Sequence, residues 1–349
     1  MTPVALILAG GLGLGAYQLG ACRALAEVEL FEVQAIAGAS IGAINGAILA
    51  GNAPETRLEA LAEFWEAVTS DLPPSAWIDP LGWNRHGMLR HGRNWTSVLS
   101  ARLGGVPNLF RPRLAGSGGQ PTASLYDVAP VRDTLARFID FDRLNDGPVR
   151  LCIATTDVET GESVRFDTAA GDRITIDHLI ASGGLLPSFA PLRIDGRLLG
   201  DGGFSTNAPL DPFLASDRIG NVPRLCFLLD LFAPDVAVTG GLENVIERSI
   251  DLQFACQTLV TLDRLQRERT LAARLEPDGD STDLVYLRYR ASADEAGPEK
   301  TFDFSRATIR DRIARGAADA AAAIAMLSSV PRTDAAGLRI HRVRGDARS

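Results

Sequence analysis

The pentapeptide Gly38-Ala39-Ser40-Ile41-Gly42 carries the residue types of a nucleophilic serine site. It fits the pattern G-x-S-x-G, in which the serine occupies a sharp turn from a strand into a helix and the two glycines relieve crowding of the backbone. Such a turn lifts the hydroxyl above the sheet. It also brings the N–H of Ile41, at the positive end of the following helix, near an oxyanion formed on a bound acyl carbon. The motif therefore predicts acyl-group chemistry at Ser40.

A serine nucleophile needs a base, which is most often a histidine. Of the four histidines, His86 and His91 lie in a tryptophan-containing segment and His341 lies in a basic tail. His178 stands at an expected helix start, where a capping or surface role is the simpler interpretation. No histidine therefore completes the usual order of serine, acid and histidine.

An aspartate offers a second candidate for the base. Asp201 lies in the stretch LLGDGGFSTNAPL, directly before Gly202 and Gly203 and after an apolar run. A tight turn at this place would aim the carboxylate back across a sheet. Aspartate before glycine is also common in ordinary turns, so the residue pattern alone leaves both interpretations open.

A glycine-rich stretch, GGLGLG at 10–15, follows the apolar run 4–8. Its Gly11 and Gly13, with Ala16, match the dinucleotide-binding fingerprint G-x-G-x-x-G/A. That fingerprint also requires an acidic residue at the end of the second strand, to bind the ribose. The second expected strand runs instead into Gly-Ala-Ser, which disfavours a dinucleotide site.

The elements that position these motifs follow the pattern of an α/β sheet. Short apolar runs at 4–8 and 33–37 predict buried strands, and they alternate with helical patterns at 16–30 and 41–50. Further along the chain, we expect helices at 54–68, 128–138, 241–274 and 305–327, a hairpin about Asp195-Gly196, and strands in VRLCIATTDVETG, SVRFDT, RLCFLLDLF and DLVYLRY.

The composition excludes some classes of function. A net charge of −8 argues against a nucleic-acid partner, which needs a clustered basic surface. No apolar run reaches the roughly 18 residues that span a bilayer. The four cysteines, Cys22, Cys152, Cys226 and Cys256, lie far apart in apolar stretches, so we expect buried thiols in a reducing, cytoplasmic environment and no metal site.

The order of the three motifs, a glycine-rich loop, then G-x-S-x-G, then D-G-G, resembles the patatin-like phospholipases, a family of serine acyl hydrolases. The resemblance extends over about 4–212 and is carried by GLGLGAYQLG, GASIGAINGAILAGNAP, ASGGLLPSFAPL and IDGRLLGDGGFSTNAPL. The segments DLQFACQT and DFSRATIRDRIARGAADA resemble the C-terminal extension of a bacterial subgroup. Leu12 and Leu14 depart from the family pattern, which has three consecutive glycines and a basic residue before the last glycine.

The resemblance implies a Ser-Asp dyad that needs neither a histidine nor a metal or cofactor. Ser40 matches the nucleophile and Asp201 the general base. The backbone N–H groups of Gly11, Leu12, Gly13 and Ile41 would form the oxyanion hole. The glycines that support these motifs are Gly10, Gly15, Gly38, Gly42, Gly202 and Gly203.

The same resemblance implies a three-layer α/β/α sandwich with a mostly parallel central sheet and a mainly helical C-terminal extension. We expect a catalytic domain at 1–215, with an irregular insertion at about 71–120 that contains short helices and three of the four tryptophans. The extension, 216–349, would pack on the same core, and its tail, from about residue 330, would be flexible.

The predicted activity is hydrolysis of a phospholipid, lysophospholipid or acylglycerol ester through an acyl-enzyme. Two alternatives stay open. The same serine would serve acyl transfer to an alcohol or thiol, because both reactions begin with the acyl-enzyme. The chain would also fit a non-catalytic lipid-binding module, in which the tryptophans and Phe110 form an apolar mouth or lid, and peripheral contact with a membrane is compatible with either function.

Overall fold

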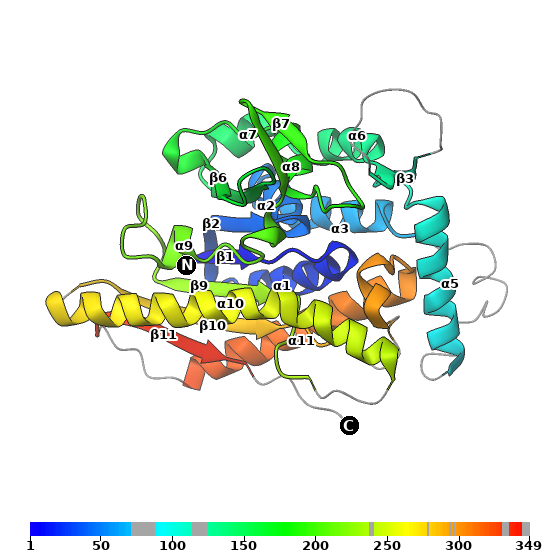
Figure 1. Cartoon of the computed structure of the whole chain (residues 1–349). Coiled ribbons are helices and arrows are strands. Elements are labelled where there is room, and N and C mark those ends of the chain that lie inside the picture. The colour runs from blue at the N-terminus through cyan, green and yellow to red at the C-terminus, as the bar shows by residue number, and fades with distance from the viewer. Residues whose placement is uncertain are drawn as a thin grey trace.

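The structure is a computed structural model of the 349-residue chain (Figure 1). It describes residues 1–70, 88–113, 124–236, 241–277, 279–292, 295, 297–329 and 335–343. Trp77, Trp83 and His86 lie outside these ranges.

A central sheet of nine strands organises the described part of the chain, in the order β11-β10-β9-β1-β2-β5-β8-β7, with β6 paired to β5. All pairings from β11 to β5 along this order are parallel, whereas β6, β7 and β8 pair antiparallel. The strands are β1 (Thr2–Leu8), β2 (Phe31–Ala39), β5 (Arg150–Asp157), β6 (Ser163–Asp167), β7 (Leu192–Ile194), β8 (Arg197–Asp201), β9 (Leu225–Asp230), β10 (Ser281–Arg288) and β11 (Gly337–Arg342). The predicted α/β fold with a mostly parallel central sheet is confirmed.

Helices connect and cover these strands (Figure 1). The α-helices are α1 (Ala16–Glu27), α2 (Ile41–Ala50), α3 (Arg57–Ala67), α5 (Met88–Gly104), α6 (Ala129–Phe138), α7 (Phe141–Asp146), α8 (Ile176–Ser182), α9 (Asp211–Leu214), α10 (Leu242–Leu275) and α11 (Arg306–Ser329). The shorter elements are the 3₁₀ turns η1 (Leu12–Gly15), η2 (Thr168–Ala170), η3 (Gly202–Phe204) and η4 (Gly297–Phe302), and the small strands β3 (Arg111–Pro112) and β4 (Tyr126–Asp127). In the described ranges, no helix combines the length with the apolar composition needed to cross a membrane.

The core lies on the parallel strands, because these carry apolar side chains on both faces. β1 is buried continuously from Val4 to Leu8, and β9 is buried from Cys226 to Asp230. The continuous apolar runs in the sequence therefore mark the centre of the sheet, where helices exclude water from both sides.

The C-terminal part of the chain packs directly on the N-terminal part. α1 and α11 approach so closely that a Cβ on Gly20 would lie 1.8 Å from the Ile313 carbonyl oxygen, and one on Gly316 would lie 2.0 Å from that of Tyr17. The Tyr17 hydroxyl also donates a hydrogen bond of 3.0 Å to Asp319. Larger side chains at the two glycines would force the helices apart, so these glycines set the spacing.

Three regions differ from the sequence-based expectations. The segment 71–120 contains α5, a helix of 17 residues whose Val98 and Ala101 are buried at helical spacing, where we expected short helices. Residues 337–342 of the expected flexible tail form β11, which pairs with β10 along its whole length. Cys256 is exposed, unlike the other three cysteines, because it lies on the outward face of α10.

Candidate active site

Ser40 occupies a strained turn between β2 and α2. Its φ and ψ angles are 53° and −125°, a backbone conformation that side-chain-bearing residues rarely adopt. The glycines on either side permit the turn by close approach, since a Cβ on Gly38 would lie 2.4 Å from the Gly42 carbonyl oxygen and one on Gly42 would lie 2.1 Å from that of Leu8. The motif requires glycine at both positions because backbone atoms occupy the space that a Cβ would need.

The register of the sheet brings Ser40 and Asp201 to the same level. On one side of β5, Ala39 of β2 pairs with Ala154. On the other side, Asp201 at the end of β8 pairs with Thr155. Ser40 comes directly after Ala39, and Asp201 is itself paired. Two residues 161 positions apart in sequence are therefore brought beside adjacent residues of β5.

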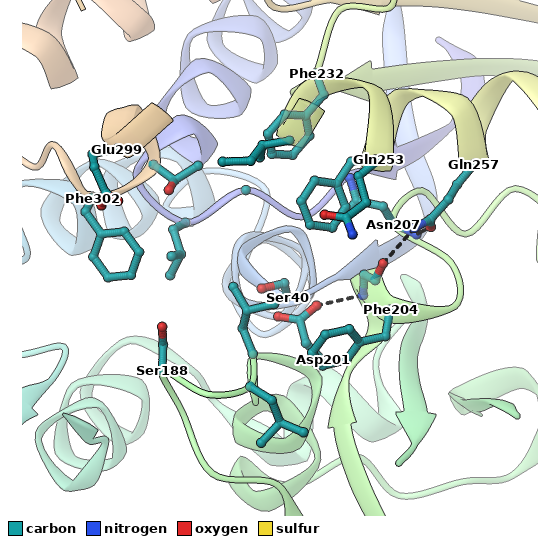
Figure 2. A pocket seen from close by; sticks show the side chains of 18 of the residues that line it. Ser40, Ser188, Asp201, Phe204, Asn207, Phe232, Gln253, Gln257, Glu299 and Phe302 are labelled. Carbon is teal, nitrogen blue, oxygen red and sulfur yellow. Dashed lines mark hydrogen bonds between the residues drawn. The ribbon is translucent and has the colours of Figure 1, made fainter. Parts of the chain in front are cut away.

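The Ser40 and Asp201 side chains point toward one another (Figure 2). Both are buried. One Asp201 carboxylate oxygen accepts the Gly203 N–H at 2.6 Å, which fixes the carboxylate in the turn. Burial raises the pKa of Asp201 to about 6, and hydrogen bonding from the Ser40 hydroxyl and the Gly203 N–H opposes that rise. The carboxylate is therefore a stronger base than an exposed aspartate, while most of it is still ionised at neutral pH.

Ser182, at the end of α8, holds the backbone of the serine turn. Its Oγ accepts the Ser40 N–H at 3.0 Å and donates to the Ala154 carbonyl oxygen at 2.7 Å. These two bonds tie the turn to β5, the strand that sets the register of Ser40 with Asp201. Ser182 lies in the stretch ASGGLLPSFAPL, one of the segments that carry the family resemblance, and its sequence pattern alone indicates no role in the site.

A cavity of about 420 Å³ opens over the two side chains. Its walls come from both halves of the chain, and Figure 2 shows most of the side chains. The lining residues are Gly11, Leu12, Ser40, Arg102, Leu185, Leu186, Ser188, Asp201, Gly203, Phe204, Asn207, Phe232, Ile250, Gln253, Phe254, Gln257, Glu299, Thr301 and Phe302. Apolar side chains make up much of this set, and the Ser40 and Asp201 side chains lie among them.

The glycine-rich loop forms one wall of the cavity. Gly11 and Leu12 line it, whereas Gly13 and Ile41 are not among its lining residues. Leu12 has a φ of 48°, a left-handed conformation that costs a non-glycine residue about 1–2 kcal/mol. The departure from the family's glycine at this position therefore carries backbone strain. A Cβ on Gly13 would lie 3.0 Å from a guanidinium nitrogen of Arg312, so a side chain at this position would meet α11.

Arg312 is fully buried on α11 and supports the loop from behind. Its guanidinium donates to the carbonyl oxygens of Lys300 and Asp303 at 2.7 and 2.9 Å and pairs with Glu295 at 2.7 Å. Burial alone would raise the pKa of Glu295, but the Arg312 charge holds it below its usual value. The pair fixes the segment around η4 against the glycine-rich loop.

Two amide side chains brace the turn that carries Asp201. Gln257 of α10 donates to the Gly203 carbonyl oxygen at 3.0 Å and accepts the Asn207 N–H at 3.0 Å. Asn207 donates in turn to the Gly10 carbonyl oxygen at 3.3 Å. The aspartate turn, the glycine-rich loop and α10 are therefore linked by one hydrogen-bond network.

A charged pair with an aromatic ring closes another side of the cavity. Arg102 donates to Glu299 at 2.8 Å, and its guanidinium lies 3.5 Å from the centre of the Phe302 ring. Phe110, considered above for an apolar mouth, is buried instead and packs against Phe302 and Tyr126. Phe110 is thus part of the core beneath this wall.

The histidines whose side chains the structure describes have other roles. His178 forms a capping box with Thr175 at the start of α8, as its sequence position suggested. His341 contacts Asp283 at 2.7 Å, on β10. Neither lines the cavity. Among the described residues, no group of three or more His, Cys, Asp or Glu side chains is arranged to hold a metal ion.

Several cavity residues escaped the sequence-based assignment of the site. Gln253, Phe254 and Gln257 line the cavity and lie in DLQFACQT. Arg312, which supports the glycine-rich loop without lining the cavity, lies in DFSRATIRDRIARGAADA. Both segments resemble a C-terminal extension, and neither indicates a role in the site by its own pattern. Glu299 and Phe302 lie in a short 3₁₀ turn that has no motif. Such residues reach the site through tertiary packing, which local patterns do not encode.

The fold and the site together define an α/β protein with a candidate serine hydrolase centre. A family model for the patatin-like phospholipases matches residues 6–214, so the chain belongs to the patatin-like phospholipase family, whose members are lipid acyl hydrolases. No curated protein matches the chain.

Comparison with solved structures finds similarity to two bacterial proteins. VipD from Legionella pneumophila shows 13% sequence identity and a TM-score of 0.36, covering 91% of this chain and 66% of its own. Full-length ExoU of the Pseudomonas aeruginosa type III secretion system, solved in complex with full-length SpcU, shows 19% identity and a TM-score of 0.28, covering 79% of this chain and 53% of its own. The chain thus spans about two thirds and about half of these two proteins.

Proposed function

We propose that the protein is a lipid acyl hydrolase that uses Ser40 as nucleophile and Asp201 as general base. The observation that carries the proposal is the convergence of these two buried side chains in one cavity, from turns on opposite sides of β5. The raised pKa of Asp201, about 6, suits a base that must gain and return a proton near neutral pH.

The first half of the reaction forms an acyl-enzyme. Ser40 Oγ attacks the ester carbonyl carbon while its proton passes to the Asp201 carboxylate. The resulting tetrahedral oxyanion collapses, the bond to the alcohol breaks, and the alcohol leaves with the proton from Asp201. Asp201 is then ionised again and the acyl chain is esterified to Ser40.

The second half reverses the roles of the leaving and attacking groups. Water loses a proton to Asp201 as its oxygen attacks the acyl carbon. The second oxyanion collapses, and the proton returns from Asp201 to Ser40 Oγ as the fatty acid leaves. In both halves, Asp201 takes up and returns each proton, so the reaction needs no histidine or other proton carrier.

Backbone N–H groups of Gly11, Leu12, Gly13 and Ile41 are the proposed oxyanion donors. Support comes from the position of Gly11 and Leu12 in the cavity wall and from the position of Ile41 at the start of α2. The first N–H groups of a helix have no partner inside it and carry the positive end of its dipole. One such donor contributes on the order of 10²–10³ to kcat in enzymes where it has been removed.

The proposed substrate is an ester of a fatty acid, such as a phospholipid, lysophospholipid or acylglycerol. Phe232, Phe254, Ile250 and Leu185 give the cavity apolar walls against which an acyl chain would pack. Membership of the patatin-like phospholipase family supports the same class of substrate.

We further infer that 1–215 and 216–349 act as one catalytic unit. The extension provides β9, β10 and β11 of the central sheet. It also provides cavity walls from α10 and η4. Removal of the extension would therefore expose the sheet edge at β1 and open the cavity.

Hydrolysis of p-nitrophenyl esters of increasing chain length tests the proposal. The Ser40→Ala variant should lose activity to background, and Asp201→Asn should lose on the order of 10²–10⁴ in kcat. Ser188→Ala is a matched control, because Ser188 is a second buried serine in the same cavity, and it should retain most of the activity. Undiminished hydrolysis by Ser40→Ala, or loss of hydrolysis only in Ser188→Ala, would contradict the assignment.

A further inference from the structure

Large apolar side chains are exposed to solvent around the mouth of the cavity. Leu186 and Phe204 belong to the cavity wall and are also among the exposed apolar residues. They come from different segments, since Leu186 follows α8 and Phe204 ends η3. The apolar wall of the cavity therefore continues outward onto the surface at two separate points.

Helix α5 extends this apolar surface on another side. Arg102 lines the cavity, and Leu99 and Leu103 lie beside it on the same helix, at positions i−3 and i+1. Both leucines are exposed, and Leu103 has 71% of its surface accessible. Val98 and Ala101 of the helix face the core, so Leu99 and Leu103 are not needed to hold α5 in place.

Helix α10 also carries exposed apolar residues that extend the cavity wall. Ile250 and Phe254 line the cavity, and Leu242 and Ile246 continue the same row at four-residue spacing toward the start of the helix. Leu242 is 76% exposed, and Ile246 is also exposed. This row thus runs from the cavity wall to the solvent without a polar interruption.

We infer that these six residues, named here the rim (Leu99, Leu103, Leu186, Phe204, Leu242 and Ile246), dock the protein on the surface of a lipid bilayer. The inference rests on the proposed function, because a lipid ester would enter the cavity through an opening whose wall includes Leu186 and Phe204, and the other four residues continue α5 and α10 outward from that wall. A protein partner seated on the rim would close that opening. A bilayer leaves it in contact with the substrate, which resides in the same lipid layer.

The charges on the protein specify the kind of lipid surface. Arg102, which lies between the exposed leucines of α5 in sequence, is paired with Glu299, and the chain carries a net charge of −8. Attraction to anionic lipid is therefore not the driving force. Apolar insertion predicts binding to zwitterionic phosphatidylcholine vesicles that changes little with salt.

Flotation of the full chain with phosphatidylcholine vesicles tests this inference. The double variant Leu99→Ser/Leu103→Ser removes two exposed rim residues that do not line the cavity. Its matched control is Leu271→Ser/Leu275→Ser, which changes two exposed leucines near the other end of α10, one of them 84% exposed. The rim variant should partition to vesicles at least roughly tenfold less well than the natural protein, and the control should partition as well as it does.

A soluble ester separates this inference from the proposed function. All three proteins should hydrolyse p-nitrophenyl butyrate at the same rate, because the cavity is unchanged in each. Equal flotation of the rim variant and the control, or no flotation of the natural protein, would overturn the docking inference, as would a dimer that only the rim variant dissociates. Flotation that depends on the rim, in a protein without any esterase activity, would instead support the docking and refute the proposed function.

Discussion

Ser40 and Asp201 face each other from the two sides of β5, with no histidine among the described residues that line their cavity. In the proposed mechanism, the ionisation of Asp201 controls whether the serine can be activated. Burial of the carboxylate, which raises its pKa to about 6, links the chemistry of the site to both the pH dependence of activity and the stability of the fold.

The first prediction concerns the pH profile. Only the ionised carboxylate accepts the Ser40 proton, so kcat/KM should rise about tenfold per pH unit below pH 6 and level off above it. Initial rates with p-nitrophenyl butyrate between pH 4.5 and 8 measure the profile.

Asp230 provides the control for that profile. Burial also raises the pKa of Asp230 to about 6, but this residue does not line the cavity. An Asp230→Asn variant should keep the inflection near pH 6. Loss of the inflection in Asp230→Asn would show that Asp230, and not Asp201, is the group whose titration controls activity.

The second prediction is that Asp201→Asn stabilises the fold while it removes activity. The folded pKa of about 6 lies above the ordinary value of 3.8, so the folded chain binds the proton more tightly and loses stability as the pH rises from about 4 to 6. Above pH 6 the ionised carboxylate costs on the order of 3 kcal/mol. Asparagine removes this cost and still accepts the Gly203 N–H.

Thermal unfolding measures the second prediction. Asp201→Asn should melt a few degrees above the natural protein at pH 8. The difference should shrink as the pH falls toward 4, because Asp201 is then protonated in the folded chain and its burial no longer costs an ionised carboxylate. An equal difference at both pH values would mean that the effect does not come from ionisation.

The third prediction concerns Ser182. Alanine at this position leaves the buried Ser40 N–H and the Ala154 carbonyl oxygen without the hydroxyl between them. An unsatisfied buried group costs about 1–3 kcal/mol. We expect Ser182→Ala to lower kcat roughly tenfold with little change in KM, since the serine turn shifts and the cavity walls stay in place. Unchanged kcat would show that the turn is held without Ser182.

The fourth prediction concerns the buried pair of Arg312 and Glu295. Arg312→Met strands the Glu295 carboxylate in the core and should destabilise the fold by about 3–5 kcal/mol, measured by urea unfolding. The double variant Arg312→Met/Glu295→Gln removes the stranded charge and should recover a large part of that loss. A double variant no more stable than the single one would mean that lost packing, and not the charge, is responsible.

The sequence allowed the architecture to be predicted wherever a feature was local. The continuous apolar run at 4–8 predicted a central strand, and the G-x-S-x-G motif predicted the turn at Ser40, because both depend on neighbouring residues. The same holds for the capping role of His178, which acts within one helical turn.

The remaining features depend on contacts between distant segments. Nothing near Asp201 in sequence indicates that β5 would align it with Ser40, and the resemblance to a family was needed to single it out. The bracing of its turn by Gln257 and the support of the glycine-rich loop by Arg312 come from α10 and α11, which join the site only when the sheet is complete. The positive φ of Leu12 is likewise imposed by its loop and has no signal in a leucine side chain.

The most direct test of the central claim is to locate the nucleophile by covalent labelling. The natural protein, treated with a fluorophosphonate and then digested for mass spectrometry, should carry one label, on the peptide that contains Ser40. Ser40→Ala should carry none, Asp201→Asn should react slowly, and Ser188→Ala should react like the natural protein. A label on any other residue, or labelling of Ser40→Ala at the natural rate, would contradict the Ser40–Asp201 account.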